Sequence, residues 1–288
     1  MTLRFRRATI CQMPPTEDLL DRLERYYDAV PRVRASVEES GPFTVFVATT
    51  GWPYYARPCL GESAVATADD VRRVLGRQAE LGVPQSIEWV AETTPWLLET
   101  VSSSGLSVAV CPLLVLDGVP GGAAGTARVL DPDELADISD LSTSRAAISV
   151  GFSNPGTSTG AAGICERDKA LTAEYADIDD ALLESMRAGR LRHAAVYDAD
   201  DPGAGPVGGG SYSAVAGVAE IAGVGVLPAY RRRRLAGQVT HVLARDALDS
   251  GVTTVFCSAQ SDEVARVYEA VGFRRVGTAC IAAVASDP

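Results

Sequence analysis

The chain has 288 residues, 47% of them hydrophobic, and a formal net charge of −11 at pH 7. This hydrophobic content excludes a disordered protein, and no apolar run reaches the roughly 18 to 20 residues of a membrane span. The acidic charge argues against nucleic acid as the main partner. Because the N-terminus also lacks the apolar stretch of a secretory signal, we expect a cytoplasmic protein of about two domains, with no membrane contact.

The six cysteines and two histidines give little support for a bound metal. The cysteines contain no CxxC pair, and most lie in apolar stretches, where cysteine behaves as a small buried hydrophobic residue. The histidines, His193 and His241, lie in unrelated segments. We therefore expect neither a disulfide framework nor a metal site.

The first 120 residues alternate between helical and strand-like patterns. The predicted elements are a helix at 16–30, a strand at 42–50, a turn-rich segment at 51–61, a helix at 68–82, a strand at 85–92, a helix at 93–105 with Pro95 in its first turn, and a strand at 106–117. The Gly-rich stretch 117–125 is the predicted linker between a domain at 1–120 and a domain at 121–288.

The second domain repeats this alternation. Its predicted elements are a strand and a helix within 127–138, a long loop at 153–163, a helix at 168–189, a strand at 191–199, a wide hairpin connection at 200–210, strands at 210–215 and 219–227, a helix at 235–248, a strand at 253–259, a helix at 261–271 and a strand at 273–284. The order of elements is similar in the two halves, which indicates two related folds.

The turn PAYRRRRLAG, residues 228–237, is the strongest candidate for binding an anion. Pro228 ends the preceding strand because it has no N–H to donate, and the four arginines lead directly into a helix. The first N–H groups of a helix have no internal partners and favour anions, and the small Ala236 and Gly237 would allow a diphosphate to approach. A solvated basic patch or a nucleic-acid contact are the alternative interpretations.

Two further residues have side chains suited to proton transfer. Tyr268 lies on the apolar face of the helix at 261–271, where it is either a buried ring or a catalytic hydroxyl. Glu220 lies in an otherwise apolar strand, where it either faces solvent or is held for acid–base work with a raised pKa.

Across residues 126–280 the chain resembles the GCN5-related N-acetyltransferase (GNAT) superfamily. The coenzyme A turn of that superfamily has the pattern Gln/Arg-x-x-Gly-x-Gly/Ala after a Val-x-Pro-like lead. Here the run from Arg231 to Ala236 follows Val226-Leu227-Pro228 in the same register. Arg234 occupies the place of the first glycine, which departs from the pattern. The segment 259–277, AQSDEVARVYEAVGFRRVG, is similar to the family segment that ends in Tyr-Glu-x-x-Gly-Phe.

The resemblance implies a role for each matching residue. Tyr268 would be the general acid that protonates the departing thiolate, and Glu220 the general base. The backbone N–H groups of Val224 and Val226 would hold the pantetheine and polarise the thioester carbonyl. The other implied contacts with acetyl-CoA are Arg231, Arg232, Arg233, Arg234, Leu235, Ala236, Gly237, Gln260 and Ser261.

The resemblance also predicts the architecture: an α/β (α+β) protein with a mixed, mostly antiparallel GNAT sheet flanked by helices, in two GNAT-like domains in tandem. Domain 1–120 matches only in the order of its elements and has no coenzyme A turn, so it would be a degenerate copy. Domain 121–288 would be the acetyltransferase domain. We expect the acceptor cleft between the two domains, with the loop 153–163 as a lid.

The function that follows is acetyl-CoA-dependent N-acyl transfer, most simply of acetyl, to a small-molecule or peptide amine by direct attack in a ternary complex. Acetyl-CoA would be the acyl donor, with no metal and no nucleic acid, and a homodimer is left open. The alternative is a non-catalytic module that binds acyl-CoA or a partner, which Arg234 at a glycine position favours. Nucleic-acid binding through the four arginines is a third interpretation.

Overall fold

The computed structural model describes residues 18–48, 54–61, 65–175 and 178–284. The first part contains α1 (Leu19–Arg32), β1 (Ala35–Ser40), β2 (Phe43–Ala48), β3 (Arg57–Pro58), α2 (Ala68–Glu80), β4 (Ser86–Val90), α3 (Leu97–Ser103) and β5 (Ser107–Leu116). The second part contains β6 (Arg128–Val129), α4 (Leu135–Phe152), α5 (Ile164–Ala170), α6 (Asp180–Arg187), β7 (Leu191–Tyr197), β8 (Pro206–Val215), β9 (Val218–Val226), α7 (Leu235–Asp249), β10 (Thr254–Ser258), α8 (Asp262–Glu269) and β11 (Phe273–Ala283).

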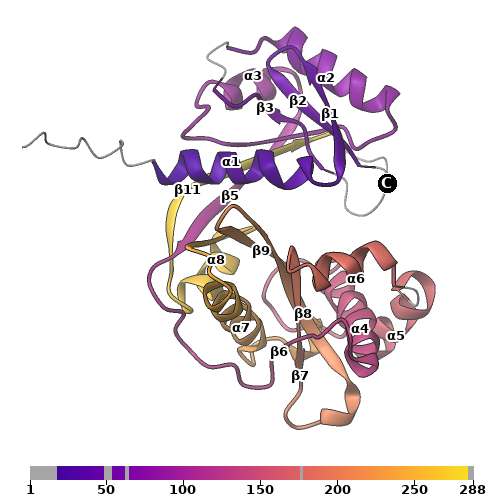
Figure 1. Ribbon diagram of the computed structural model, residues 1–288. Helices are drawn as coiled ribbons and strands as arrows, with labels where there is room; N and C mark the ends of the chain where they lie inside the picture. Colours follow the sequence, from indigo (N-terminus) through magenta and orange to yellow (C-terminus); the bar gives the residue numbers. More distant parts are fainter. Residues whose placement is uncertain (1–17, 49–53, 62–64, 176–177, 285–288) are drawn as a thin grey trace, which may run out of the picture.

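The main sheet has eight strands in the order β4-β11-β5-β10-β9-β8-β7-β6, and a separate sheet has the order β1-β2-β3. All neighbouring pairs of named strands are antiparallel except β9 and β10, which run parallel. Helices flank the main sheet (Figure 1). The predicted fold class, a mixed and mostly antiparallel sheet with flanking helices, is therefore confirmed.

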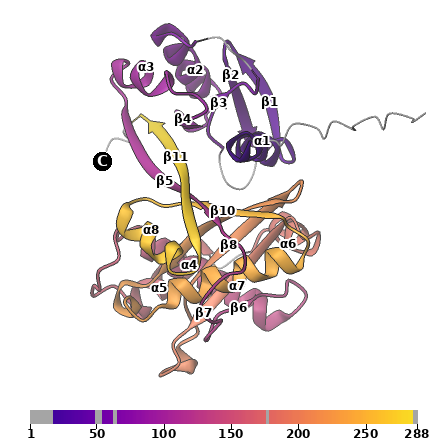
Figure 2. The ribbon, with the colours of Figure 1, turned by 90° about the vertical axis from the view of Figure 1, so that its left-hand side faces the viewer.

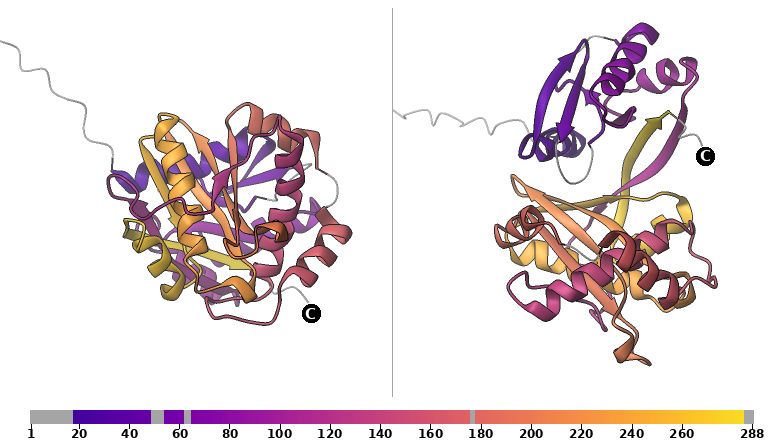
Figure 3. Two further views of the ribbon diagram at one scale, coloured as in Figure 1. Left: turned by 90° about the horizontal axis from the view of Figure 1, so that it is seen from below. Right: turned by 90° about the vertical axis from the view of Figure 1, so that its right-hand side faces the viewer.

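Two long strands connect the halves of the molecule. β11 lies between β4 and β5. Both β5 and β11 run from the part of the structure that contains α7 and α8 into the part that contains α2 and α3 (Figures 2 and 3). Strands from before and after residue 120 thus share one sheet. The division into domains 1–120 and 121–288 stays a prediction, as does the kinship of the two halves.

Helix α1 packs directly on the middle of the main sheet. Its buried residues Leu23, Tyr26 and Tyr27 share one hydrophobic cluster with residues of β4, β5, β9, β10 and β11. The rings of Tyr26 and Tyr27 each contact Phe256 edge-on, with centroids 5.0 and 5.3 Å apart. Burial of such large rings at a shared core holds the first half firmly over β9 and β10.

A run of three glycines, 208–210, allows neighbouring elements to lie very close to β8, with α4 at Gly209. A Cβ at Gly209 would lie 2.1 Å from the Ser144 hydroxyl oxygen of α4, whereas a Cβ at Gly210 would lie 3.1 Å from Val239 of α7. Because successive strand residues face opposite sides, α4 and α7 cover opposite faces of the sheet. The prediction of a hairpin connection over 200–210 is therefore wrong at its end: the glycines are strand residues needed for close approach, and not for a turn.

Other differences concern the limits of elements. The predicted helix at 168–189 is interrupted: α5 ends at Ala170, a π-helical turn follows at Leu171–Tyr175, and α6 begins only at Asp180, where Asp179 caps it. Pro95 precedes the N-cap of α3 and is not in its first turn. Strand β1 is largely exposed, with Ser40 as its buried residue, and was not predicted. No helix in the described ranges is long and apolar enough to cross a membrane.

Candidate functional site

The main sheet splits open at Glu220. β9 and β10 are paired over only three positions, and the last pair joins Phe256 to Glu220. β10 then pairs with β5 on its other side up to Ser258, while β9 continues to Val226 along β8. Residues 221–226 of β9 therefore have one edge without a partner strand, which exposes main-chain groups to whatever enters the fork.

The open edge of β9 offers a hydrogen-bond donor at Val226. Leu227 donates its N–H to Val207 of β8, at 2.9 Å, and successive strand residues point their N–H groups to opposite edges. The N–H and the carbonyl of Val226 consequently both point away from β8, and the carbonyl accepts a hydrogen bond from Arg231. Val224 lies at a register shift between β8 and β9, next to Gly223 with a φ of +65°, and it lines the cleft.

The basic turn leads into α7 as the sequence predicted. Arg234 is the N-cap residue and has a left-handed backbone with φ of +62°, and Arg232 has a φ of +66°. Arg234 thus adopts the conformation that glycine favours, although a side chain there costs about 1–2 kcal/mol. The first helical main-chain bond runs from Gln238 to Arg234, so the N–H groups of Leu235, Ala236 and Gly237 have no helical partner.

The four arginine side chains do not act alike. Arg231 donates to four main-chain carbonyl oxygens, those of Gly151, Asn154, Ser158 and Val226, so its guanidinium fixes the end of α4. Arg233 pairs with Asp198 at 2.8 Å and lies over the ring of Tyr230. Arg232 and Arg234 are exposed and make no ion pair within the described parts of the chain. These two side chains are therefore the ones available to an anion at the turn.

The loop after α4 lies against this turn. Gly160 donates to the Pro228 carbonyl at 3.1 Å, and Thr157 hydrogen-bonds to Glu263 of α8. The loop thus reaches from the turn to α8 beside the cleft, which Thr157 also lines. Ser261 caps α8 by accepting from Val264 at 3.3 Å, and Gln260 is an exposed residue that lines the cleft.

The Glu220 carboxylate lies in an environment built by both halves. It accepts a hydrogen bond from the Tyr27 hydroxyl at 3.2 Å. Burial, and next the charge of Glu88, raise the pKa of Glu220 to about 8, whereas Tyr27 and Arg57 act in the opposite direction. Arg57 is itself buried between Glu88 and Glu24, at 2.7 and 3.0 Å. A carboxyl with such a pKa exchanges its proton near neutral pH, as a general base must.

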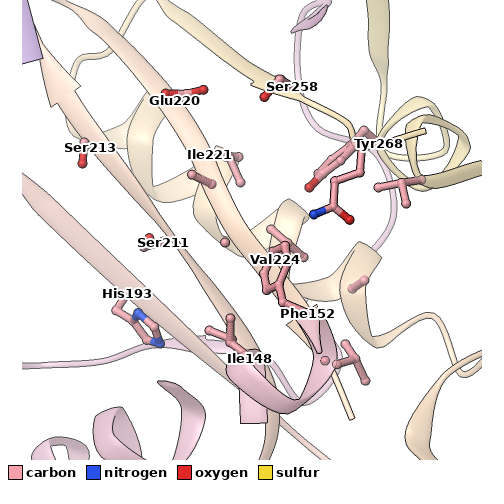
Figure 4. A pocket seen from close by; sticks show the side chains of 18 of the residues that line it. Ile148, Phe152, His193, Ser211, Ser213, Glu220, Ile221, Val224, Ser258 and Tyr268 are labelled. Atoms are coloured by element: carbon pink, nitrogen blue, oxygen red, sulfur yellow. The ribbon is translucent and has the colours of Figure 1, made fainter. Parts of the chain in front are cut away.

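Tyr268 lies across the fork from Glu220. Its ring is 5% exposed and packs edge-on against Phe273, and its hydroxyl is directed into the cleft (Figure 4). Burial is the main cause that raises the pKa of Tyr268 far above its usual range, with smaller contributions from Cys257 and Glu220. The phenol therefore keeps its proton and can donate it to a basic atom in the fork.

The fork opens into a continuous cleft of about 2050 Å³. Glu220, Ser213, Ser211 and His193 follow one another across β9, β8 and β7, since Ser213 is opposite Glu220 and Ser211 is opposite His193 (Figure 4). His193 is held by Ser144 at 3.0 Å, and burial lowers its pKa to about 3, so its ring is neutral. Of this group the sequence indicated Glu220 alone. No spacing in the sequence indicated Ser213, Ser211, His193 or Tyr27, because strand register and helix packing bring them to Glu220.

Comparison with known proteins agrees with this arrangement. Residues 165–273 match the model of the acetyltransferase (GNAT) family. The matched segment contains Glu220, the basic turn and Tyr268. No curated protein sequence matches the chain significantly. The family match and the fold support an acyl-CoA-dependent acetyltransferase in general.

Several solved structures are similar to this chain, and the first of them shows its fold. A GCN5-related N-acetyltransferase from Kribbella flavida is 18% identical with a TM-score of 0.63, over 94% of this chain and 98% of the other. A GCN5-related N-acetyltransferase-like protein from Streptococcus suis is 12% identical, over 92% and 98%, with a TM-score of 0.49. A tandem GNAT protein from the clavulanic acid biosynthesis pathway is 15% identical, over 85% and 79%, with a TM-score of 0.44.

Proposed function

We propose that this protein transfers an acetyl group from acetyl-CoA to the nitrogen of a primary amine. The observation that carries the proposal is the fork itself. It has an open strand edge, a proton acceptor on one side in Glu220, and a proton donor on the other in Tyr268. Acetyl transfer to an amine needs these three features: a held thioester, a base and an acid.

The chain offers suitable contacts for acetyl-CoA. The free N–H groups of Leu235 to Gly237, with the side chains of Arg232 and Arg234, would hold the diphosphate. The open edge of β9 at Val226 would bind the pantetheine and the thioester oxygen. The side chains of Arg231 and Arg233 would support the turn indirectly, because both already have partners. When bound, acetyl-CoA supplies the acetyl carbon that bonds to nitrogen and the sulfur that leaves.

Glu220 would take the proton from the acceptor. An ammonium group entering the cleft must lose a proton before its nitrogen can attack, and a carboxylate with a pKa of about 8 is ionised in a sufficient fraction at pH 8 to accept it. Tyr27 would keep this carboxylate turned toward the cleft by its hydrogen bond. Tyr268 would give its proton to the departing sulfur and take up the second proton that the nitrogen loses as the amide forms, so that the thiol and the amide both leave neutral.

Direct attack by the amine fits the cysteines of the site. Within the described residues, Cys111 is the cysteine that lines the cleft. Burial raises the pKa of the Cys111 thiol, and the nearby charge of Glu88 adds to this effect, so the thiolate that an acyl-enzyme would need is disfavoured. We therefore propose a ternary complex and no covalent enzyme intermediate.

We further propose that the first half is a GNAT-like partner domain that binds no acyl-CoA. The start of α2 supports this, because a capping box already uses the N–H groups of Thr67 and Asp70. Asp70 accepts from the backbone of Thr67 at 2.9 Å, and the Thr67 side chain accepts from Asp70 N–H. An anionic side chain thus occupies the place where a phosphate would bind.

Thiol release tests this function. Purified protein is mixed with acetyl-CoA and a panel of amines, free thiol is followed over time, and the products are weighed by mass spectrometry. The proposal predicts amine-dependent thiol release and an acetylated amine, with no acetylated protein when the amine is left out. Binding of acetyl-CoA without thiol release with any amine would instead establish the non-catalytic alternative.

A further inference from the structure

The cleft has opposite electrical character at its two ends. At the fork, the carboxyl groups of Glu220, Glu88 and Glu24 outnumber the single guanidinium of Arg57. Beyond His193, the cleft is lined by three arginines, Arg34, Arg145 and Arg190, with Asp179 as the nearby acid. Asp179 is used as the cap of α6. The far end is therefore cationic although the whole chain carries a net charge of −11.

Arg145 is the half-buried cation at this end, whereas Arg34 and Arg190 are exposed. Arg145 belongs to α4, lines the cleft, and lies over the ring of Tyr175 at 5.2 Å. It forms no ion pair with any described residue. By contrast, Arg34 donates to the Ala181 carbonyl at 2.7 Å and to Ser185. A half-buried guanidinium without a carboxylate is costly unless a ligand supplies the anion.

Arg145 belongs to the acceptor end and not to the phosphate turn. It lies six residues before Gly151, which contacts Val226 and accepts from Arg231, so along α4 it is about 9 Å from that contact. Its charge is instead felt by His193, whose pKa it helps to lower after burial. The turn has its own cations in Arg232 and Arg234.

The surface between Arg145 and Glu220 is polar and neutral. Ser211, Ser213 and the neutral His193 lie on the face that α4 covers, since Gly209 on the same face meets Ser144. Two strand spacings separate β9, which carries Glu220, from β7, which carries His193, so the backbones of these two strands lie roughly 10 Å apart, and Arg145 lies beyond His193. A ligand that reaches both ends therefore needs a chain of several atoms.

We infer that the acceptor is an amine that also carries a carboxylate several bonds away, such as an ω-amino acid or a peptide with a free carboxylate. The ammonium group would lie at Glu220 and the carboxylate would bind the Arg145 guanidinium. This inference rests on the proposed acetyl transfer and adds the class of acceptor. A zwitterion has no net charge, so the acidic surface of the protein does not repel it.

Matched amines test the inference. The substrates are glycine, β-alanine, γ-aminobutyrate and 6-aminohexanoate, each compared with its neutral primary amide. For the wild type we expect kcat/KM to favour the acid over its amide by roughly 10- to 100-fold for the longer chains only. Calorimetric binding of 6-aminohexanoate and its amide to the protein without acetyl-CoA provides a readout that does not need turnover.

Arg145→Gln should abolish this preference for the acid in both measurements and leave the KM for acetyl-CoA unchanged. Arg145→Lys should retain part of the preference, and Arg245→Gln, at an exposed ion pair on α7, should retain all of it. Equal turnover of acids and amides by the wild type would overturn the inference while acetyl transfer stands. A raised KM for acetyl-CoA in Arg145→Gln would also overturn it, by assigning Arg145 to the donor.

Absence of thiol release with any amine would instead defeat the proposed function. Arg145-dependent binding of 6-aminohexanoate would in that case still support a carboxylate site, and its absence would remove that site as well.

Discussion

The hydroxyl of Tyr27 donates a hydrogen bond to the carboxylate of Glu220 at 3.2 Å, across 193 residues of sequence. Tyr27 belongs to α1 in the first half of the chain, and Glu220 lies at the fork of β9 and β10 in the second. The neighbouring Tyr26 donates to the Ser213 carbonyl at 2.9 Å and accepts from the Glu220 N–H. The first half therefore forms part of the environment of the proposed base.

Tyr27→Phe should raise the pKa of Glu220 above its value of about 8, because the hydrogen bond from Tyr27 favours the ionised carboxylate. A hydrogen bond to a charged group contributes about 1.5 kcal/mol, which corresponds to about one pH unit. The ascending limb of kcat/KM against pH should move upward by about that amount.

Two other variants provide controls for this shift. Tyr26→Phe removes a neighbouring hydroxyl that contacts only main-chain groups, so it should leave the limb in place. Glu88→Gln removes the like charge that helps to raise the pKa, so it should move the limb downward. If Tyr27→Phe and Tyr26→Phe gave the same profile, the Tyr27 hydrogen bond would have no part in setting the pKa.

Glu220→Gln should make the fold less sensitive to alkaline pH. The pKa of Glu220 is raised from an ordinary 4.5 to about 8, so the folded protein holds this proton more tightly than the unfolded chain. The contribution that this tightly held proton makes to the free energy of unfolding is fully present below pH 4.5 and is lost as pH rises through 8. Glutamine resembles the protonated form, and the melting temperature of the variant should exceed that of the wild type increasingly from pH 5 to pH 9. A constant difference would show that Glu220 is not buried as described.

Arg234→Gly should stabilise the protein and weaken acetyl-CoA binding, because it relieves a left-handed backbone and removes one of the two side chains proposed to hold the diphosphate. Arg234 has a φ of +62°, and relief of the left-handed strain is worth about 1 kcal/mol or less after the entropy cost of glycine. Arg234→Ala removes the same charge but keeps the strain, so it should not stabilise. Chemical denaturation distinguishes the two variants, and equal stabilities would mean that the backbone at this position carries no strain.

Gly209→Ala should destabilise the protein by about 1–3 kcal/mol, the usual cost of overpacking. Its Cβ would lie 2.1 Å from the Ser144 hydroxyl and 2.5 Å from the Ala194 carbonyl, both parts of the packed site. Gly76→Ala on α2 is the matched control, because no atom of the described residues lies within 4 Å of its Cβ and alanine favours a helix by about 1 kcal/mol. Denaturation midpoints that move in the same direction for both would contradict this packing of α4.

Much of the second half could be predicted from the sequence because its local signals agree with one another. The basic turn after Pro228, the α7 segment and the segment ending at Gly272-Phe273 are continuous stretches whose spacing fixes their structure. The sequence also placed Glu220 in a strand and Tyr268 in a helix, as found, whereas their positions on the two sides of the fork depend on strand pairing. The left-handed backbone of Arg234 follows from the turn, although its residue type argues against it.

The parts of the fold and of the candidate site that the sequence did not indicate depend on contacts between distant segments. Nothing in the spacing of Tyr27 or His193 marks them, since α1 packing and strand register bring them to the cleft. Glycines 208–210 have the composition of a turn, and only the approach of α4 shows that they belong to β8. The long pairing of β11 with β5 likewise joins the last strand to the first half, which local patterns cannot indicate.

The most direct test of the central proposal is the rate of acetyl transfer by Tyr268→Phe at saturating acetyl-CoA and amine. Tyr268 is buried and keeps its proton, and its loss removes one hydroxyl without opening a large cavity. We predict a decrease in kcat of about 10²- to 10⁴-fold, with unchanged affinity for acetyl-CoA. A kcat equal to that of the wild type would contradict the assignment of Tyr268 as the acid that protonates the leaving thiol.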